Sequence, residues 1–200
     1  MVALAAAALT LVLTNLQGLP LSRPTLERAV AAALADTGLA LRWDAAPPGT
    51  GRTHGAGEVR IILLDAHPRR GRDLVLGSVL RERGRTHALW VYVGDVRRVL
   101  EGARPGSSNA LQLSIAVGRV IAHEIAHLVA PRQPHAGDGL MGRRVDRRVL
   151  LAQEAPLDAD SQSAIRSALA GAPGADRPAG AASAFSIPGA LDGAASGLLR

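Results

Sequence analysis

The spacing of apolar residues predicts alternating helices and strands between residues 24 and 169. A first helix is expected at residues 24–37, because apolar side chains recur there with helical spacing, Thr25 can cap the helix and Gly38 can end it. Strands are expected where apolar residues alternate with polar ones or run together, at residues 39–43, 59–64, 73–80 and 87–93. A loop rich in Pro and Gly at residues 45–57, a helical turn at 96–101 and a closing helix at 158–169 complete the short elements.

The longest predicted helix spans residues 110–129, and Ser107, Ser108 and Asn109 before it offer side chains that can cap its start. Apolar residues cover nearly all sides of this helix, so we expect it to be central and buried. The elements together predict a single α+β domain. In this domain, a small mixed β-sheet packs on an N-terminal helix and on the buried helix.

The two ends of the chain differ from this central domain, which we place at residues 23–170. Residues 1–13 are almost wholly apolar but too short to span a bilayer, which takes about 20 residues. We therefore predict a hydrophobic leader or signal peptide at residues 1–22, with a buried first helix as the alternative, and a secreted or cell-envelope protein without a membrane span. Residues 171–200 are rich in Ala, Gly and Pro without periodicity, and we expect a disordered tail there.

Composition narrows the chemistry that this domain can carry out. The chain has no Cys, which excludes disulfides, thiolate metal sites and a cysteine nucleophile, so a metal site must use His, Asp or Glu. Aromatic residues make up only 2% of the chain, too few for platforms on which nucleic-acid bases stack. The net charge is +6 and all 23 basic residues are Arg, which is compatible with a protein that binds anionic polymers or a membrane surface. Because these arginines are scattered among Asp and Glu, we favour a solvated surface and expect no specific nucleic-acid partner.

The motif that carries chemistry lies within the long helix, where His123 and Glu124 are followed by His127. Residues four apart lie on one face of a helix, so both imidazoles can bind the same ion, and zinc readily accepts His nitrogen. Glu124 can then act as the general base for a metal-bound water. Polar side chains in so apolar a helix are costly unless something satisfies them, and a metal ion does so. Core histidines bonded to main-chain carbonyls are the alternative.

The residues after the helix extend this pattern. Pro131 cannot continue the helix, so the chain must turn, and it reaches His135 eight residues beyond His127. A glycine-rich turn follows and carries Met141, one of only two methionines.

Residues 123–130, then His135, then Gly139, Leu140 and Met141 resemble the metzincin clan of zinc metallopeptidases. They are more similar still to a group of uncharacterised secreted bacterial proteins with an HEIGH-type helix, a nearby His and a Gly-Ile/Leu-Met turn. This resemblance extends over about residues 25–169, although only residues 123–141 are specific. The chain departs from the metzincin pattern, since Ala130 stands in place of a Gly and Gln133 in place of the third His.

The resemblance implies a metalloendopeptidase that acts on peptide or protein substrates, with Glu124 as the catalytic base. It implies Zn²⁺ as the cofactor, bound by His123, His127 and a third ligand. We expect His135 to be that ligand, with Asp138 and Glu154 as alternatives.

The same resemblance implies that Met141 lies beneath the metal and that a strand beside the active-site helix binds extended substrate. Residues 89–93 are the candidate strand, with Tyr92 either facing the site or packed in the core. A binding module that keeps zinc for structure is the competing function, and it would be favoured if Asp138 closed the site with a fourth ligand. The oligomeric state stays open.

Overall fold

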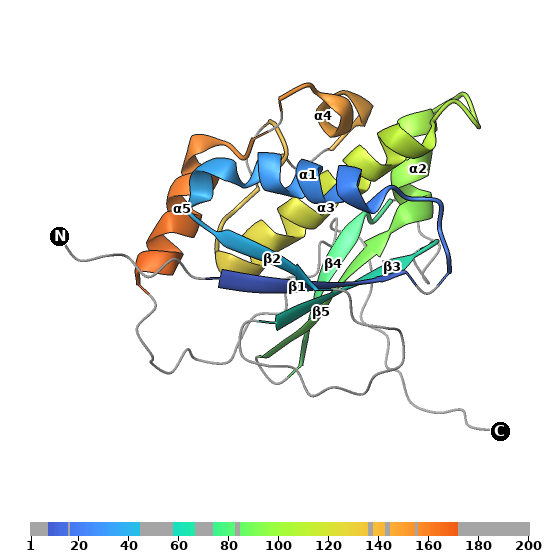
Figure 1. Ribbon diagram of the computed structural model, residues 1–200. Coiled ribbons are helices and arrows are strands. Elements are labelled where there is room, and N and C mark those ends of the chain that lie inside the picture. The colour runs from blue at the N-terminus through green and yellow to red at the C-terminus, as the bar shows by residue number, and fades with distance from the viewer. Residues whose placement is uncertain are drawn as a thin grey trace, which may run out of the picture.

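The computed structural model describes residues 8–15, 17–44, 58–66, 74–82, 85–135, 138–142, 145–154 and 156–171. The strands are β1 (Ala8–Asn15), β2 (Ala40–Asp44), β3 (Glu58–Leu64), β4 (Gly77–Glu82) and β5 (Arg85–Tyr92). The helices are α1 (Arg23–Ala33), the short 3-10 helix η1 (Ala35–Thr37), α2 (Val93–Glu101), α3 (Ala110–Val129), α4 (Arg147–Leu151) and α5 (Ala159–Ala170). Figure 1 shows the helices gathered on one side of the sheet. The predicted α+β class, a mixed sheet packed on an N-terminal helix and a buried central helix, is confirmed.

The sheet has five strands in the order β2-β1-β3-β5-β4. The first four are parallel to one another, and β4 pairs antiparallel with β5 at one end of the sheet. Alternate residues of β3 (Val59, Ile61 and Leu63) are buried and join the core beneath the helices. The other face of β3 is half-buried, so the continuous apolar run at residues 61–64 overstated burial on that side.

Strand β1 lies within the segment that the sequence suggested as a leader. It pairs with β2 on one side and with β3 on the other, and Leu11 in its middle is fully buried. An apolar run of this length is compatible with a leader, a buried helix or a buried strand, because periodicity alone does not separate them. Export and the leader stay predictions, but a cut after residue 22 would remove β1 from between two strands of the sheet.

We expect a chain that begins at residue 23 to lose its cooperative unfolding transition, because β2 and β3 would then have no strand between them. Thermal or urea unfolding of the purified chains measures this. A chain that ends at residue 171, without the predicted disordered tail, is the control and should keep the transition of the full chain. If the chain beginning at residue 23 unfolds cooperatively near the midpoint of the full chain, β1 is not an integral strand.

Helix α1 begins one residue earlier than predicted, and its N-cap is Ser22 rather than Thr25. Pro24 lies in the first turn, where its fixed φ suits a helix and its missing N–H costs no hydrogen bond. Thr25 is buried one turn inside, with its hydroxyl 2.9 Å from that of Ser22. Gly38 follows η1 with a φ of +75°, a left-handed conformation that favours glycine, which explains why it ends the helical segment.

Helix α3 spans the predicted residues and forms the centre of the core. Asn109 caps it and exchanges reciprocal hydrogen bonds with Gln112, which satisfies main-chain N–H groups at its start. Gly118 lets α1 approach closely, since a Cβ built there would lie 2.7 Å from the Leu26 carbonyl oxygen and 2.8 Å from the Ala29 side chain. This packing fixes the position of the last two turns of α3, which carry the histidines.

Two elements differ from the sequence prediction. Helix α2 runs on directly from β5 and is longer than the expected helical turn, with Asp95 in its first turn. Helix α4 was not predicted, because its five residues are too few to show apolar periodicity; Asp146 caps its start by accepting from the Val149 N–H. The closing helix α5 is confirmed, with Asp158 as its N-cap. None of the described helices is both long and apolar enough to cross a membrane.

Candidate metal centre

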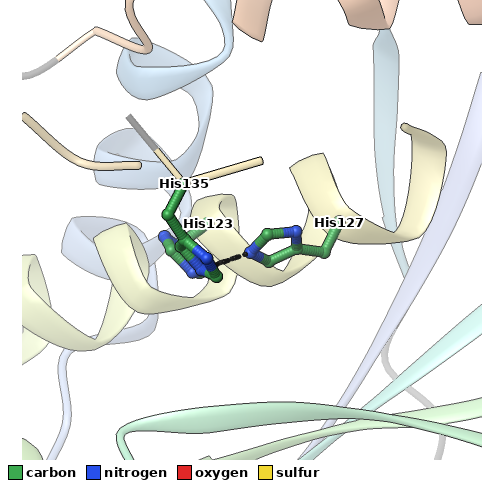
Figure 2. Close-up of side chains that lie close together, drawn as sticks. All are labelled: His123, His127 and His135. Carbon is green, nitrogen blue, oxygen red and sulfur yellow. Dashed lines mark hydrogen bonds between the residues drawn. The ribbon is translucent and has the colours of Figure 1, made fainter. Parts of the chain in front are cut away.

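Three histidine side chains meet at the C-terminal end of α3. His123 and His127 lie one turn apart on the helix, and His135 comes from the segment that follows it (Figure 2). The Nε2 atom of His127 lies 3.0 Å from that of His123 and 3.1 Å from that of His135. The ligand atoms of the three residues all lie within 4.8 Å of one another. The structure thus brings together the three histidines that the sequence suggested as metal ligands.

The main chain fixes the orientation of His123. Its Nδ1 lies 2.8 Å from the carbonyl oxygen of Leu140, which can only accept a hydrogen bond, so Nδ1 carries the proton. In the neutral imidazole this leaves a lone pair on Nε2, the atom that faces the other histidines. Metal-binding histidines usually have such a partner on the second nitrogen. The contact also ties the turn at residues 139–142 to α3.

Burial keeps the two helical histidines neutral. It lowers the pKa of His123 to about 4 and, together with the charges of His123 and His135, lowers the pKa of His127 to about 3. Neutral imidazole is the form that binds a metal ion, so both side chains are ready to bind at ordinary pH.

The donor set fits zinc. A single proton on Nε2 of His127 could satisfy only one of its two nitrogen neighbours, whereas one cation between the rings satisfies all three lone pairs. Ligand nitrogens on a tetrahedral zinc lie about 3.4 Å apart for Zn–N bonds of about 2.0–2.1 Å. The separations of His127 Nε2 from the other two nitrogens, 3.0 and 3.1 Å, are close to this value. Nδ1 of His127 is buried and has no hydrogen-bond partner among the residues that the structure describes. The ring of His127 therefore lacks the support that the Leu140 carbonyl gives the ring of His123.

Glu124 lies next to this cluster on α3 and is almost completely buried, with 4% of its surface exposed. No hydrogen bond or ion pair to it is found within the described part of the chain, and burial raises its pKa to about 8. Its carboxylate faces Gly77 at the start of β4. A carboxyl group whose pKa lies near neutrality can both take up and release a proton at ordinary pH, which is what a general base needs.

The other candidate ligands lie away from the cluster. Asp138 and Glu154 are both exposed, and the metal-binding group found among the described residues contains neither of them. Of the remaining histidines, His54 and His67 lie outside the described residues, and His87 lies on β5. The described residues therefore supply three ligands to the cluster and no fourth.

The glycine-rich turn after His135 forms as predicted. The N–H of Gly142 donates to the carbonyl of Gly139 over 3.1 Å, and Gly139 has a φ of +78°. Met141 in this turn is fully buried and belongs to the core beneath the helices. The turn presents the Leu140 carbonyl to His123, a partner that no sequence pattern indicated.

The strand suggested for substrate binding is not at the edge of the sheet. Strand β5, which contains most of residues 89–93, lies between β3 and β4, so both of its edges are paired. Strand order depends on long-range pairing, which the sequence pattern does not contain, and the strand at that end of the sheet is β4. Tyr92 is buried, with its hydroxyl 3.3 Å from that of Ser78 on β4, and burial raises its pKa. This agrees with the core position considered for it.

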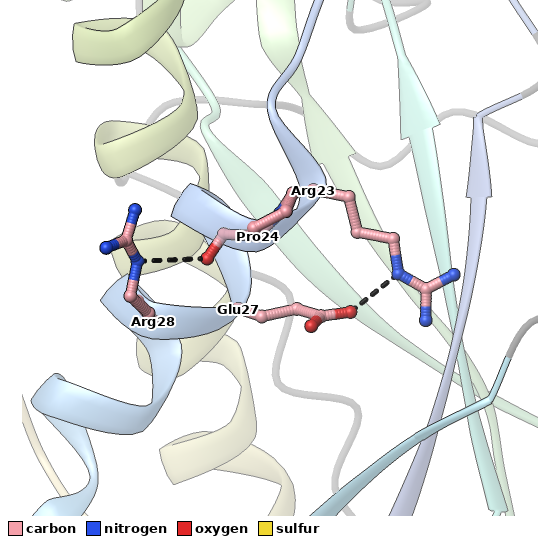
Figure 3. Close-up of polar contacts among 4 residues, drawn as sticks. All are labelled: Arg23, Pro24, Glu27 and Arg28. Atoms are coloured by element: carbon pink, nitrogen blue, oxygen red, sulfur yellow. Dashed lines mark hydrogen bonds and ion pairs between the residues drawn. The ribbon is translucent and has the colours of Figure 1, made fainter.

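Several arginines are engaged within the fold. Arg119, one turn before His123, is buried and donates to the carbonyls of Val149 and Ala152, which ties α4 to α3. Arg81 of β4 donates to the carbonyls of His127 and Leu128 at the end of α3. On the outer side of α1, Arg23 pairs with Glu27 at 2.6 Å (Figure 3). In these contacts the side chains of Arg119 and Arg81 anchor one element to another, and that of Arg23 forms a local ion pair.

Comparison with known proteins gives a similarity among solved structures. Neither a family model nor a curated protein sequence matches the chain. Among solved structures, it is similar to a zinc-dependent peptidase from Methanocorpusculum labreanum strain Z. The match covers 78% of this chain and 99% of that chain, with a TM-score of 0.52 and 14% sequence identity. The two proteins share a fold. At this level of identity the similarity establishes nothing beyond the fold.

The buried ionisable groups predict how the stability of the metal-free protein depends on pH. The pKa of Glu124 is raised to about 8, so its protonated form contributes stability that is fully present below about pH 4.5 and is lost as pH rises through 8. The pKa values of His123 and His127 are lowered, so their contribution is present above about pH 6.5 and is lost as pH falls towards 4.

We therefore expect Glu124→Gln, measured with a chelator present, to gain stability relative to the unsubstituted protein as pH rises from 4.5 to 8. The gain should be on the order of a few kcal/mol. Urea unfolding at several pH values measures it, and Glu154→Gln, an exposed site, is the control. If the difference in unfolding free energy between Glu124→Gln and the unsubstituted protein does not change with pH, the effect of burial on Glu124 is contradicted.

Proposed function

We propose that this chain is a zinc-dependent hydrolase that cleaves peptide bonds, a metalloendopeptidase of the metzincin type. The observation that carries the proposal is the meeting of three imidazole nitrogens at the end of α3, the helix that also carries the buried Glu124. Three protein ligands leave one position of a tetrahedral zinc open, as in catalytic sites, whereas structural sites are usually closed by four. The exposed positions of Asp138 and Glu154 support the open set.

The roles of the residues follow from their positions. His123, His127 and His135 would hold the ion, with the Leu140 carbonyl fixing the ring of His123. Zinc, when bound, polarises a substrate carbonyl and lowers the pKa of a nearby water. Glu124 accepts the proton that this water releases on attack and then donates it to the nitrogen of the leaving amine, so the same carboxyl serves as base and acid.

Strand β4 supports an extended peptide as the substrate. It lies at the end of the described sheet, and its first residue, Gly77, contacts Glu124. A peptide that adds to a sheet edge binds through its main chain, which places a peptide bond alongside the residues next to that edge. Here Gly77 of β4 faces Glu124, and Arg81 of the same strand donates to the carbonyl of His127 at the end of α3.

Hydrolysis of a quenched fluorescent peptide library by the full chain tests the proposal. We expect cleavage that stops with a chelator and returns when zinc is restored to about one equivalent per chain. His123→Ala is the matched control. It should show no cleavage at any zinc concentration at which the peptide alone, without enzyme, stays intact. A folded chain that binds zinc but cleaves no peptide would favour the binding module and overturn the enzymatic proposal.

A further inference from the structure

Gly77 stands at an unusual place for a glycine, at the start of strand β4 with a buried position facing α3. A Cβ built on Gly77 would lie 2.7 Å from Oε1 of Glu124, 2.8 Å from its Cγ and 3.0 Å from its Cδ. The carboxylate therefore occupies the space that any other residue at position 77 would fill. A glycine in a strand is costly to order, and it is found where another group approaches closely.

The kind of contact distinguishes Gly77 from the other crowded glycines. A Cβ at Gly118 or Gly94 would meet main-chain oxygen atoms, which cannot move without moving the backbone. The three nearest atoms to a Cβ at Gly77 all belong to one side chain, that of Glu124. Because the crowded atoms all belong to one side chain, a methyl group at position 77 would displace Glu124 rather than the backbone. The register of β4 on β5, with Gly77 opposite Val91, holds position 77 in place while this happens.

We infer that Gly77 is a positioning residue for Glu124, keeping open the space that the carboxylate occupies between β4 and α3. The inference rests on the proposed function, in which Glu124 is the general base. Gly77 itself takes no part in proton transfer. Its role is to let β4 approach α3 so closely that the Glu124 side chain is held in one position against the strand.

The first test compares Gly77→Ala with Leu111→Ala, a substitution at an exposed side chain in the first turn of α3, three turns before the histidines. We expect Gly77→Ala to bind zinc as the unsubstituted chain does. Its thermal unfolding midpoint should lie within a few degrees of that of the unsubstituted chain. Its kcat should fall by about 100-fold with a small change in KM, because misplacing a catalytic group by about 1 Å costs this much. Leu111→Ala should keep the full kcat.

Combining the substitutions separates positioning of Glu124 from a general effect on the strand. If Gly77 acts through Glu124, Gly77→Ala should have no further effect on kcat in a chain that already carries Glu124→Gln. An equal loss in both backgrounds would overturn the inference.

A second readout does not depend on activity. In metal-free protein labelled with ¹³C at the Glu side-chain carboxyl carbons, the resonance of Glu124 is assigned by its absence in Glu124→Gln. We expect Gly77→Ala to shift this resonance and Leu111→Ala to leave it in place. If the resonance does not move in Gly77→Ala, the inference is overturned even when the enzyme is active. If the resonance moves but the unsubstituted chain cleaves no peptide, the contact between Gly77 and Glu124 stands and only the proposed hydrolysis is refuted.

Discussion

Replacing Glu124 with Gln is expected to lower kcat for peptide cleavage by about 10³-fold, within the range of about 10²–10⁴-fold that general acid–base groups contribute. Gln has nearly the same size and stays in the same buried space, but it cannot accept the proton that water must lose. Zinc content should stay at that of the unsubstituted protein, because the three histidines are unchanged. Peptide cleavage and metal analysis on the same purified sample measure both quantities.

The control for this substitution is Glu154→Gln, which makes the same chemical change at an exposed carboxylate away from the cluster. It should leave both kcat and zinc content unchanged. A Glu124→Gln variant that keeps kcat within tenfold of the unsubstituted enzyme would show that another group takes the proton. Loss of zinc in that variant would instead mean that Glu124 helps to hold the ion.

The part of the site that lies on α3 was predictable because it is local. Helical spacing alone places His123 and His127 on one face, and the apolar residues around them indicate that the helix is buried. The turn after the helix was also predictable, since Pro131 and Gly139 have strong backbone preferences. Which of His135, Asp138 and Glu154 lies at the cluster depends on how an irregular segment folds back, and residue spacing does not determine that path.

The sheet shows where sequence reasoning reaches its limit. Four strands were recognised from their apolar pattern, but β1 was assigned to a leader because an apolar run fits both descriptions. Strand order was not predictable either, since it is set by crossover connections between distant segments. As a result β5 was taken as the substrate strand although β4 lies at the end of the described sheet. A glycine in a strand indicates that some group approaches closely, but only the structure identifies Glu124 as that group at Gly77.

Replacing His135 with Ala is expected to lower zinc affinity by more than about 100-fold. Removing only the hydrogen-bond partner of a metal-binding histidine already lowers metal affinity by about 10–100-fold, and the loss of the ligand itself should cost more. His123 and His127 alone would hold the ion with two nitrogens, too few to retain it through dialysis against a chelator. Because His135 is half-buried after the end of α3, its removal should leave the helix and the sheet intact. Zinc quantification after dialysis, with circular dichroism on the same sample, separates loss of the metal from loss of the fold.

Matched substitutions at the two alternative ligands make this prediction specific. Asp138→Ala and Glu154→Ala should retain one zinc per chain after the same dialysis, because both side chains are exposed and lie outside the histidine group. Should Asp138→Ala lose its zinc while His135→Ala keeps it, the segment after α3 must fold differently around the ion and Asp138 would be the third ligand. If Asp138→Ala and His135→Ala both lose their zinc, four ligands would close the site, and a structural role for zinc would replace the catalytic one. If His135→Ala and Asp138→Ala both retain their zinc, Glu154 would be the third ligand, and loss of zinc in Glu154→Ala would show it.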